Sequence, residues 1–184
     1  MIHVTFPKNA AHFRKSSNPM KTFLSLLLLI PFTTFASLEE LVGPELINAA
    51  GEKVPASSLA GKVVGLYFSA EWCPPCKAFT PELVKLRDSA SDKFEVVFVS
   101  SDRSPEAQQK YMKDYKMNWL AVPHDSPLRE QLQQKYDIQG IPSLVIINDQ
   151  GELITSEGRS EMGDGDASGV LNKWISAAGK DSNN

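Results

Sequence analysis

A run of apolar residues, KVVGLYFSA at positions 62–70, constrains the fold more strongly than any other segment of the chain. Apolar side chains occupy successive positions of this run, which is the pattern of a strand that is buried on both faces. Further along, Phe79, Leu83 and Leu86 recur at helical spacing and predict a helix with one apolar face. Because such a strand requires helices on both sides of its sheet, the sequence predicts an α/β fold.

The remaining segments extend this prediction to a mixed β-sheet. Ala50 and Gly51 mark the turn of a small N-terminal β-hairpin. Six later elements follow, in chain order a strand at 94–101, helices that begin with Ser-Pro at 104 and at 126, two strands joined by a turn at 148–151, and a helix at 168–178. We therefore predict a central mixed β-sheet that is flanked by helices on both faces.

The first 36 residues differ in composition from the rest of the chain. Lys21 precedes an apolar run and a stretch of small residues that ends at Ala36, which is the layout of a secretory signal peptide. An uncleaved membrane anchor is the alternative. Roughly 17 uncharged residues only reach the lower limit of what spans a bilayer, and Pro31 near their middle weakens that reading.

The chain accordingly divides into three parts. Residues 1–19 are either a leader or the result of a start assigned too early, with Met20 as the true first residue. Residues 20–36 are the predicted signal peptide, and residues 37–184 are the predicted domain. We expect this domain to be exported, to a periplasmic or other extracytoplasmic space, unless the N-terminal segment stays uncleaved as an anchor.

The charge of the domain excludes one class of partner. The whole chain has a formal charge of −3 at pH 7. Removing residues 1–36 takes away four basic groups and no acidic group, which leaves a charge of −7. An acidic surface repels phosphate, so we expect no nucleic-acid partner. It also lacks a basic patch for anionic lipid, so we expect no stable membrane insertion once the signal is cleaved.

Both cysteines, Cys73 and Cys76, lie between the predicted strand and helix and are separated by two prolines. Such a pair can bind a metal, staple a loop or carry electrons. A disulfide over two residues closes too short a loop to stabilise much. Structural zinc needs four ligands, and the domain holds one histidine, His124. We predict a redox-active dithiol without metal or cofactor; a copper site from the pair and that histidine is the alternative.

The two prolines assign a role to each sulfur. If Cys73 is the N-cap, its thiolate lies at the positive end of a helix dipole, which lowers its pKa. Pro74 and Pro75 have no N–H, so Cys76 is the first residue of the turn whose backbone N–H can point at the Cys73 sulfur. We therefore predict that Cys73 attacks a substrate disulfide and that Cys76 resolves the mixed disulfide.

A further proline stands at the start of another predicted strand. The segment QGIPSLVI places Pro142 where a proline is unwelcome inside a buried strand. A cis Ile141–Pro142 bond in a tight turn explains this position, and a trans proline at the first residue of the strand explains it equally well. The residues alone leave both interpretations open.

The segment GKVVGLYFSAEWCPPCKAFTPELVKL resembles the active-site segment of the tryparedoxin and nucleoredoxin branch of the thioredoxin superfamily. The likeness continues through FEVVFVSSDRS, WLAVPHDSPLREQLQQKYDIQGIPSLVIIN and GRSEMGDGD. It implies a thioredoxin fold and a thiol–disulfide oxidoreductase, most directly a protein-disulfide reductase. It also implies that Trp72 shields the pair, that Pro142 is cis, and that Ile141 presents its backbone to a bound polypeptide.

Two features depart from this resemblance. Many thioredoxins carry a buried acid six residues before the first cysteine, whereas this chain has Tyr67, and a phenol is a poor base at neutral pH. We read the nearby Glu71 as a solvated surface acid, so the general base stays unassigned. The family is also best known inside cells, so the export signal shifts the expected partners to disulfide-bearing envelope proteins and a reductase in the envelope.

Other readings follow for the function and for single residues. The alternatives to a monomeric reductase are an oxidant that introduces disulfides and a copper-binding or redox-sensing module without turnover. Trp119 and Trp174 are predicted core residues. Asp102 is either a loop cap or a functional acid, and His124 is predicted to lie on a loop surface.

Overall fold

The computed structural model describes residues 1, 3, 37–163 and 166–181. The predicted leader and signal peptide therefore lie outside the described residues, apart from two isolated positions. The described residues from 37 onward belong to one compact unit. Within this described part, no helix is long and apolar enough to cross a membrane.

Seven strands of the described residues form one sheet in the spatial order β2-β1-β5-β4-β3-β6-β7. Their bounds are β1 Glu45–Ile47, β2 Lys53–Pro55, β3 Val63–Ser69, β4 Phe94–Ser100, β5 Leu120–Ala121, β6 Ser143–Ile147 and β7 Leu153–Thr155. Strands β3, β4 and β5 are parallel at the centre, whereas β6 runs antiparallel to β3 and β1 antiparallel to β5. The predicted mixed sheet is confirmed.

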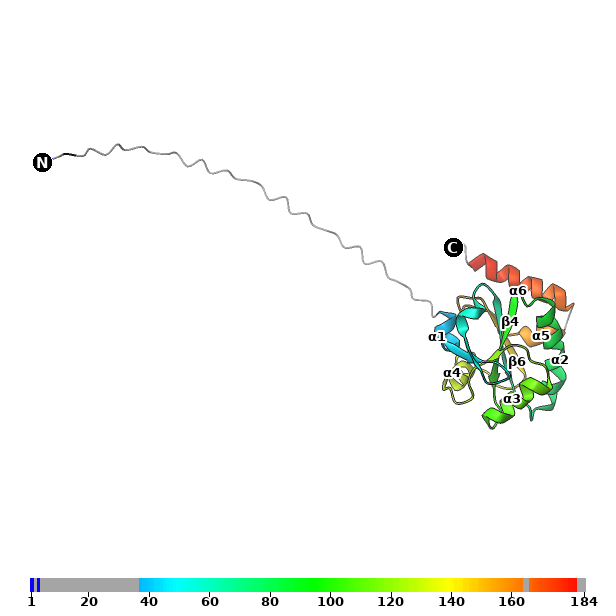
Figure 1. The fold of residues 1–184 in the computed structure, drawn as a ribbon. Helices are drawn as coiled ribbons and strands as arrows, with labels where there is room; N and C mark the ends of the chain where they lie inside the picture. The colour runs from blue at the N-terminus through cyan, green and yellow to red at the C-terminus, as the bar shows by residue number, and fades with distance from the viewer. Residues whose placement is uncertain (2, 4–36, 164–165, 182–184) are drawn as a thin grey trace. The chain divides into compact units, whose positions relative to one another are not determined.

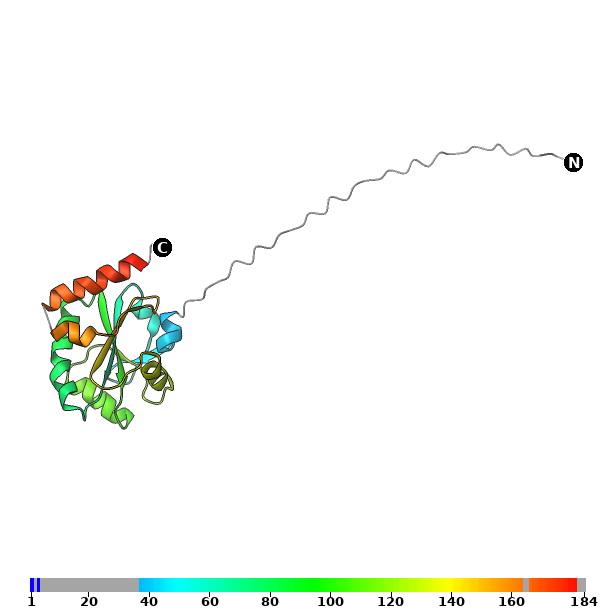
Figure 2. The same cartoon turned by 180° about the vertical axis from the view of Figure 1, so that it is seen from behind.

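Helices cover both faces of this sheet, as Figures 1 and 2 show from opposite sides. One face packs against α2 (Pro74–Ser89), α3 (Pro105–Asp114) and α6 (Ala167–Asp181). The other packs against α1 (Leu38–Val42), the 3-10 helix η1 (Ala56–Leu59) and α4 (Leu128–Lys135). A further short helix, α5 (Gly158–Gly163), lies against β6.

All seven residues of β3 are buried, because the strand is covered on both faces. Its even-numbered positions 64–68 contact the cluster that includes α1 and α4, whereas Val63 and Tyr67 contact the cluster of α2, α3 and α6. At Gly65 a Cβ atom would lie only 3.0 Å from the Phe94 ring, so the strand admits no larger residue there without displacement. The apolar run thus forms the doubly buried strand that its sequence predicts.

The structure confirms the N-terminal hairpin, both buried strands, the helix after the cysteines and the C-terminal hairpin and helix. Ser104 caps α3, since its hydroxyl accepts a hydrogen bond from the N–H of Ala107 at 3.2 Å. The predicted N-cap of α4 is wrong by one residue: the cap is Pro127 rather than Ser126. The chain first makes a tighter turn, in which the N–H of Arg129 donates to the Ser126 carbonyl.

Four short elements of the described part were not predicted, namely α1, η1, β5 and α5. A sequence signal existed for α1. Ser37 and Glu40 form a capping box, in which each side chain accepts a hydrogen bond from the other residue's N–H. The others are too short to carry a hydrophobic period.

Candidate active site

Cys73 and Cys76 lie at the junction between β3 and α2. Cys73 is the N-cap of α2, with an extended backbone, and Pro74 and Pro75 are the first two helical residues. A proline suits these positions because the first N–H groups of a helix have no partner within it. The cysteines form a disulfide whose Cα atoms are 5.2 Å apart. The predicted position of Cys73 at the helix N-terminus is confirmed.

The two sulfurs differ in their surroundings, and one expected bond is absent. Cys73 keeps 4% of its surface exposed, whereas Cys76 is 0% exposed. The predicted hydrogen bond from the Cys76 N–H to the Cys73 sulfur is wrong for this disulfide form, since the Cys73 side chain makes no capping hydrogen bond. Its sulfur is bonded to Cys76 instead. Of the two cysteines, only Cys73 keeps any exposed surface.

Trp72 forms an exposed rim beside the disulfide. Half of its surface is open to solvent, and its Nε1–H donates to the Ser101 carbonyl at 3.1 Å. This bond joins the indole to the chain just after β4. Pro74 and Pro75 are exposed next to it. Together these side chains present a flat, largely apolar surface around a buried sulfur pair.

Ile141 and Pro142 reach the cysteines from a distant part of the sequence. The Ile141–Pro142 peptide bond is cis, as the resemblance implies, and the trans alternative is excluded. The Ile141 carbonyl oxygen lies 3.7 Å from the Cys73 sulfur, and the Ile141 side chain packs against Cys73 and Cys76. Pro142 directly precedes β6, whose pairing with β3 brings this turn to the cysteines.

Asp102 connects the loop before the cysteines to the end of β4. It is 5% exposed; Oδ1 accepts from the Glu71 N–H at 2.8 Å, and Oδ2 from the Ser100 hydroxyl at 2.7 Å. Both oxygens are thus engaged, which favours the loop-cap reading. His124 lies in a turn with its surface partly exposed, and its Nε2–H donates to the Asp102 carbonyl at 2.9 Å.

A buried cluster of four hydroxyl groups lies beneath the cysteines, and we call it the hydroxyl cluster. Its members are Tyr67 of β3, Ser69 of β3, Thr80 of α2 and Tyr111 of α3. The Thr80 Oγ1 lies 2.8 Å from the Tyr67 oxygen and 2.6 Å from the Tyr111 oxygen, and Ser69 donates to Tyr67 at 2.9 Å. Burial raises the pKa of Tyr67 and of Tyr111, so both phenols stay protonated.

The charged residues nearest to the pair form an open ion pair rather than a metal site. Lys77 Nζ lies 3.3 Å from Glu71 Oε1, and more than a third of each side chain is exposed. A pair with this exposure contributes at most about 1 kcal/mol. Across the described ranges, no three His, Cys, Asp or Glu side chains come together in a group that could hold a metal ion.

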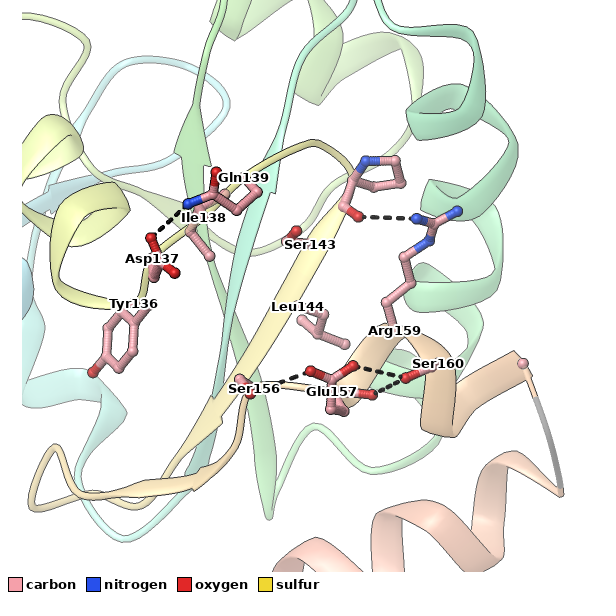
Figure 3. Close-up of a pocket in the computed structure, with 12 residues that line it drawn as sticks. Tyr136, Asp137, Ile138, Gln139, Ser143, Leu144, Ser156, Glu157, Arg159 and Ser160 are labelled. Atoms are coloured by element: carbon pink, nitrogen blue, oxygen red, sulfur yellow. Dashed lines mark hydrogen bonds between the residues drawn. The ribbon is translucent and has the colours of Figure 1, made fainter.

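A groove of about 730 Å³ begins at Pro142 and runs between the end of α4, the start of β6 and α5. Figure 3 shows its lining residues, with Tyr136 and Asp137 on one side of β6 and Glu157 and Arg159 on the other. The Arg159 guanidinium donates to the Pro142 carbonyl at 3.3 Å. Sequence reasoning did not find this groove, because its walls come from three separate segments.

Comparison with known proteins agrees with this geometry. A family model described as thioredoxin-like matches residues 61–153, half of the chain. The chain belongs to the thioredoxin-like family. Bovine nucleoredoxin is 46% identical over 129 residues, and probable nucleoredoxin 1 of Arabidopsis thaliana is 47% identical over 116 residues. These matches cover 67% and 61% of this chain but only 29% and 20% of those longer proteins.

Solved thioredoxin-like structures match over most of their own length. Thioredoxin from Wuchereria bancrofti is 41% identical, with a TM-score of 0.63, over 75% of this chain and 98% of that one. Tryparedoxin II from Crithidia fasciculata is 38% identical, with a TM-score of 0.62, over 69% and 86%. The predicted thioredoxin fold is therefore confirmed, and the chain is a thioredoxin-like member of an oxidoreductase family related to nucleoredoxins and tryparedoxins.

The structure brings together the residues that the sequence singled out. Cys73, Cys76 and Trp72 lie on one loop and helix turn, and Ile141, which precedes Pro142, lies against the two cysteines. Trp119 and Trp174 are buried in the core as predicted, at 2% and 0% exposure.

Proposed function

We propose that this chain is an exported protein-disulfide reductase in which Cys73 attacks and Cys76 resolves. One observation carries the proposal: the two sulfurs are bonded to each other at the N-terminus of α2, and Cys73 is the one with residual exposure. A thiolate at a helix N-terminus is stabilised by the helix dipole, which suits an attacking sulfur.

The reaction proceeds in two exchanges and needs no cofactor. The Cys73 thiolate attacks one sulfur of the substrate disulfide, and the other substrate sulfur leaves as a thiolate that takes a proton from water. Cys76 then loses its proton and attacks the Cys73 sulfur, which releases the second substrate sulfur as a thiol. The two electrons of the dithiol now reside in the substrate, and the protein ends with the Cys73–Cys76 disulfide seen in the structure.

The surface around Cys73 supports a polypeptide substrate. Trp72 offers a flat face, Ile141 offers a backbone carbonyl, and the groove that begins at Pro142 offers room for a further part of a bound chain. Export rests on the composition of residues 20–36, and it implies envelope proteins as substrates. A second protein, a reductase of the envelope, must then return two electrons to the monomeric domain.

Trapping the intermediate tests this proposal. We expect Cys73→Ser to lose disulfide reductase activity, because no other sulfur is reachable. We expect Cys76→Ser to accumulate mixed disulfides with its substrates, visible on non-reducing gels and released by dithiothreitol. The double variant Cys73→Ser/Cys76→Ser is the control and should trap nothing. Reductase activity that survives in Cys73→Ser contradicts the proposal.

The direction of electron flow and the export have separate tests. Equilibration with glutathione buffers gives the reduction potential; a value near about −270 mV indicates a reductase, whereas one near about −120 mV indicates an oxidant that introduces disulfides. Export predicts that protein isolated from its source begins at Ser37, which intact-mass measurement shows directly. A chain that retains residues 20–36 supports the anchored alternative.

A further inference from the structure

The hydroxyl cluster converges on one backbone atom, the carbonyl oxygen of Cys76. Thr80 Oγ1 donates to this oxygen at 2.8 Å, and the Tyr67 hydroxyl reaches it at 3.3 Å. Thr80 belongs to the same helix as Cys76, but Tyr67 belongs to β3. The carbonyl of the resolving cysteine is therefore held from the sheet as well as from its own helix.

We propose that Tyr67 and Thr80 are positioning residues for Cys76, which hold the first turn of α2 so that the Cys76 sulfur is aligned with the Cys73 sulfur when the mixed disulfide is released. The inference rests on the proposed function and deepens it, because it assigns the second exchange its own supporting residues.

The sequence of α2 explains why this turn needs support. Pro74, Pro75 and Pro81 all lie within the helix. Proline has no N–H, and inside a helix its ring also displaces the carbonyl one turn earlier, here that of Lys77. Pro74 and Pro75 cost the ladder nothing, since the N–H groups of the first two helical positions have no partner within the helix. Pro81, however, removes the bond to the Lys77 carbonyl, which directly follows that of Cys76. The Thr80 and Tyr67 hydroxyls bond the neighbouring Cys76 carbonyl and so fix the backbone next to this weakened position.

The cluster is connected beyond this carbonyl. Tyr111 of α3 contacts the hydroxyls of both Thr80 and Ser69, and Ser69 donates in turn to Tyr67. Each hydroxyl proton of the cluster therefore has an acceptor, which is either another hydroxyl of the cluster or the Cys76 carbonyl. A buried network with all its protons engaged rigidifies the elements that it joins, which here are β3, α2 and α3.

The hydroxyl cluster positions Cys76 without acting as its base. Burial raises the pKa of both phenols, and the cluster contains no carboxylate. Among the described residues the buried carboxylates are Glu95 and Asp102. Glu95 forms a two-bond ion pair with Arg87, and Asp102 accepts from Glu71 and Ser100. The release step should therefore titrate with the cysteine itself.

A two-chromophore disulfide separates the two exchanges. When 5,5′-dithiobis(2-nitrobenzoate) reacts with the reduced protein, attack by Cys73 releases one coloured thiolate and resolution by Cys76 releases the second. We expect Tyr67→Phe and Thr80→Val to slow the second phase by about tenfold, as displaced reacting groups do, and to change the first by less than about twofold. Tyr115→Phe is the matched control, because its ring packs on Tyr111 but its hydroxyl is not in the cluster.

Three further readouts separate positioning from other roles. Thr80→Ser restores a hydroxyl and should restore the second phase, which shows that a slow phase in Thr80→Val is not a loss of folding. The pH at which the second phase is half-maximal should be the same in Tyr67→Phe as in the original protein. A shift of that pH means that the cluster acts as a base and overturns the inference. An unchanged second phase in both Tyr67→Phe and Thr80→Val overturns it as well.

The same experiment keeps the inference distinct from the proposed function. If coloured thiolate is released by Cys73→Ser as fast as by the original protein, the assignment of the attacking sulfur is wrong and the whole scheme fails. If Cys73→Ser is inactive and the cluster variants resolve normally, only the positioning role fails.

Discussion

The surroundings of Cys73 and of Cys76 differ although the two residues are bonded to each other. Cys73 retains some exposure and is framed by the half-exposed indole of Trp72 and the carbonyl of Ile141. Cys76 is closed to solvent, and its carbonyl is held by buried hydroxyls. The comparison teaches that two identical side chains acquire different chemistry from their positions at one helix end. Cys73 is the N-cap and keeps some exposure, whereas Cys76 lies inside the first turn and is buried.

The largest expected effect concerns the reactivity of the two thiols. In the reduced protein, iodoacetamide at pH 7 should modify Cys73 about 100-fold faster than Cys76, because only Cys73 combines exposure with the helix N-terminus. Peptide mass spectrometry after short labelling measures the ratio. In denaturant the two rates should become similar, which is the control. Equal labelling of the folded protein would break the comparison.

A smaller effect is expected on the exposed side of the pair. Trp72→Ala should lower kcat/KM for a polypeptide disulfide by about tenfold, because it removes an aromatic contact of the kind that dominates binding surfaces. Phe at this position keeps a flat ring and should retain most of the activity. The second phase with the chromophoric disulfide should not change in either variant. A slowed second phase would mean that the two environments are not separable.

The smallest expected effect comes from a residue far from the sulfurs. It tests whether a change in overall stability alone alters the difference in reactivity between Cys73 and Cys76. Burial raises the pKa of Glu161, but hydrogen bonds from Trp174, Lys173 and Thr155 outweigh this and lower it overall from 4.5. A carboxyl with a lowered pKa stabilises the fold above its unfolded-state pKa, and this stabilisation is lost as the pH falls through the folded-state pKa.

Glu161→Gln should therefore reduce the free energy of unfolding by about 1 kcal/mol at pH 7. The difference in unfolding free energy between the variant and the original protein should shrink as the pH falls below about 4.5. Glu161 then becomes protonated and is uncharged, as the glutamine is. Urea unfolding at several pH values measures this, with the exposed Glu82→Gln as the control. The labelling ratio of the two cysteines should stay the same. If it changes, overall stability rather than local environment sets their difference.

The sequence predicted those parts of the fold that depend on local pattern. The doubly buried strand β3 followed from its apolar run, and the position of Cys73 at the N-terminus of α2 followed from the two prolines after it. In both cases the residues that decide the structure are neighbours in the chain. The cis bond before β6 was open on the residues alone and followed only from the family resemblance.

The parts that were missed depend on contacts between distant segments. The hydroxyl cluster draws Thr80 from α2 and Tyr111 from α3, and nothing in either segment alone marks these hydroxyls as partners. The bond from His124 to Asp102 was missed for the same reason, since it exists only because two loops meet. The groove at Pro142 likewise has walls from three segments, and a pattern read along one segment cannot show it.

The bonds that tie the active-site loop to the end of β4 have a consequence for binding. The Glu71 N–H is held by Asp102, and the Trp72 indole is held by the Ser101 carbonyl. A loop that is fixed in this way loses little conformational entropy when a ligand arrives, so more of the contact energy appears as affinity. Under the proposed function, a flexible substrate chain that docks beside Cys73 would meet a surface whose shape is already set, and the cost of ordering would fall mainly on the substrate.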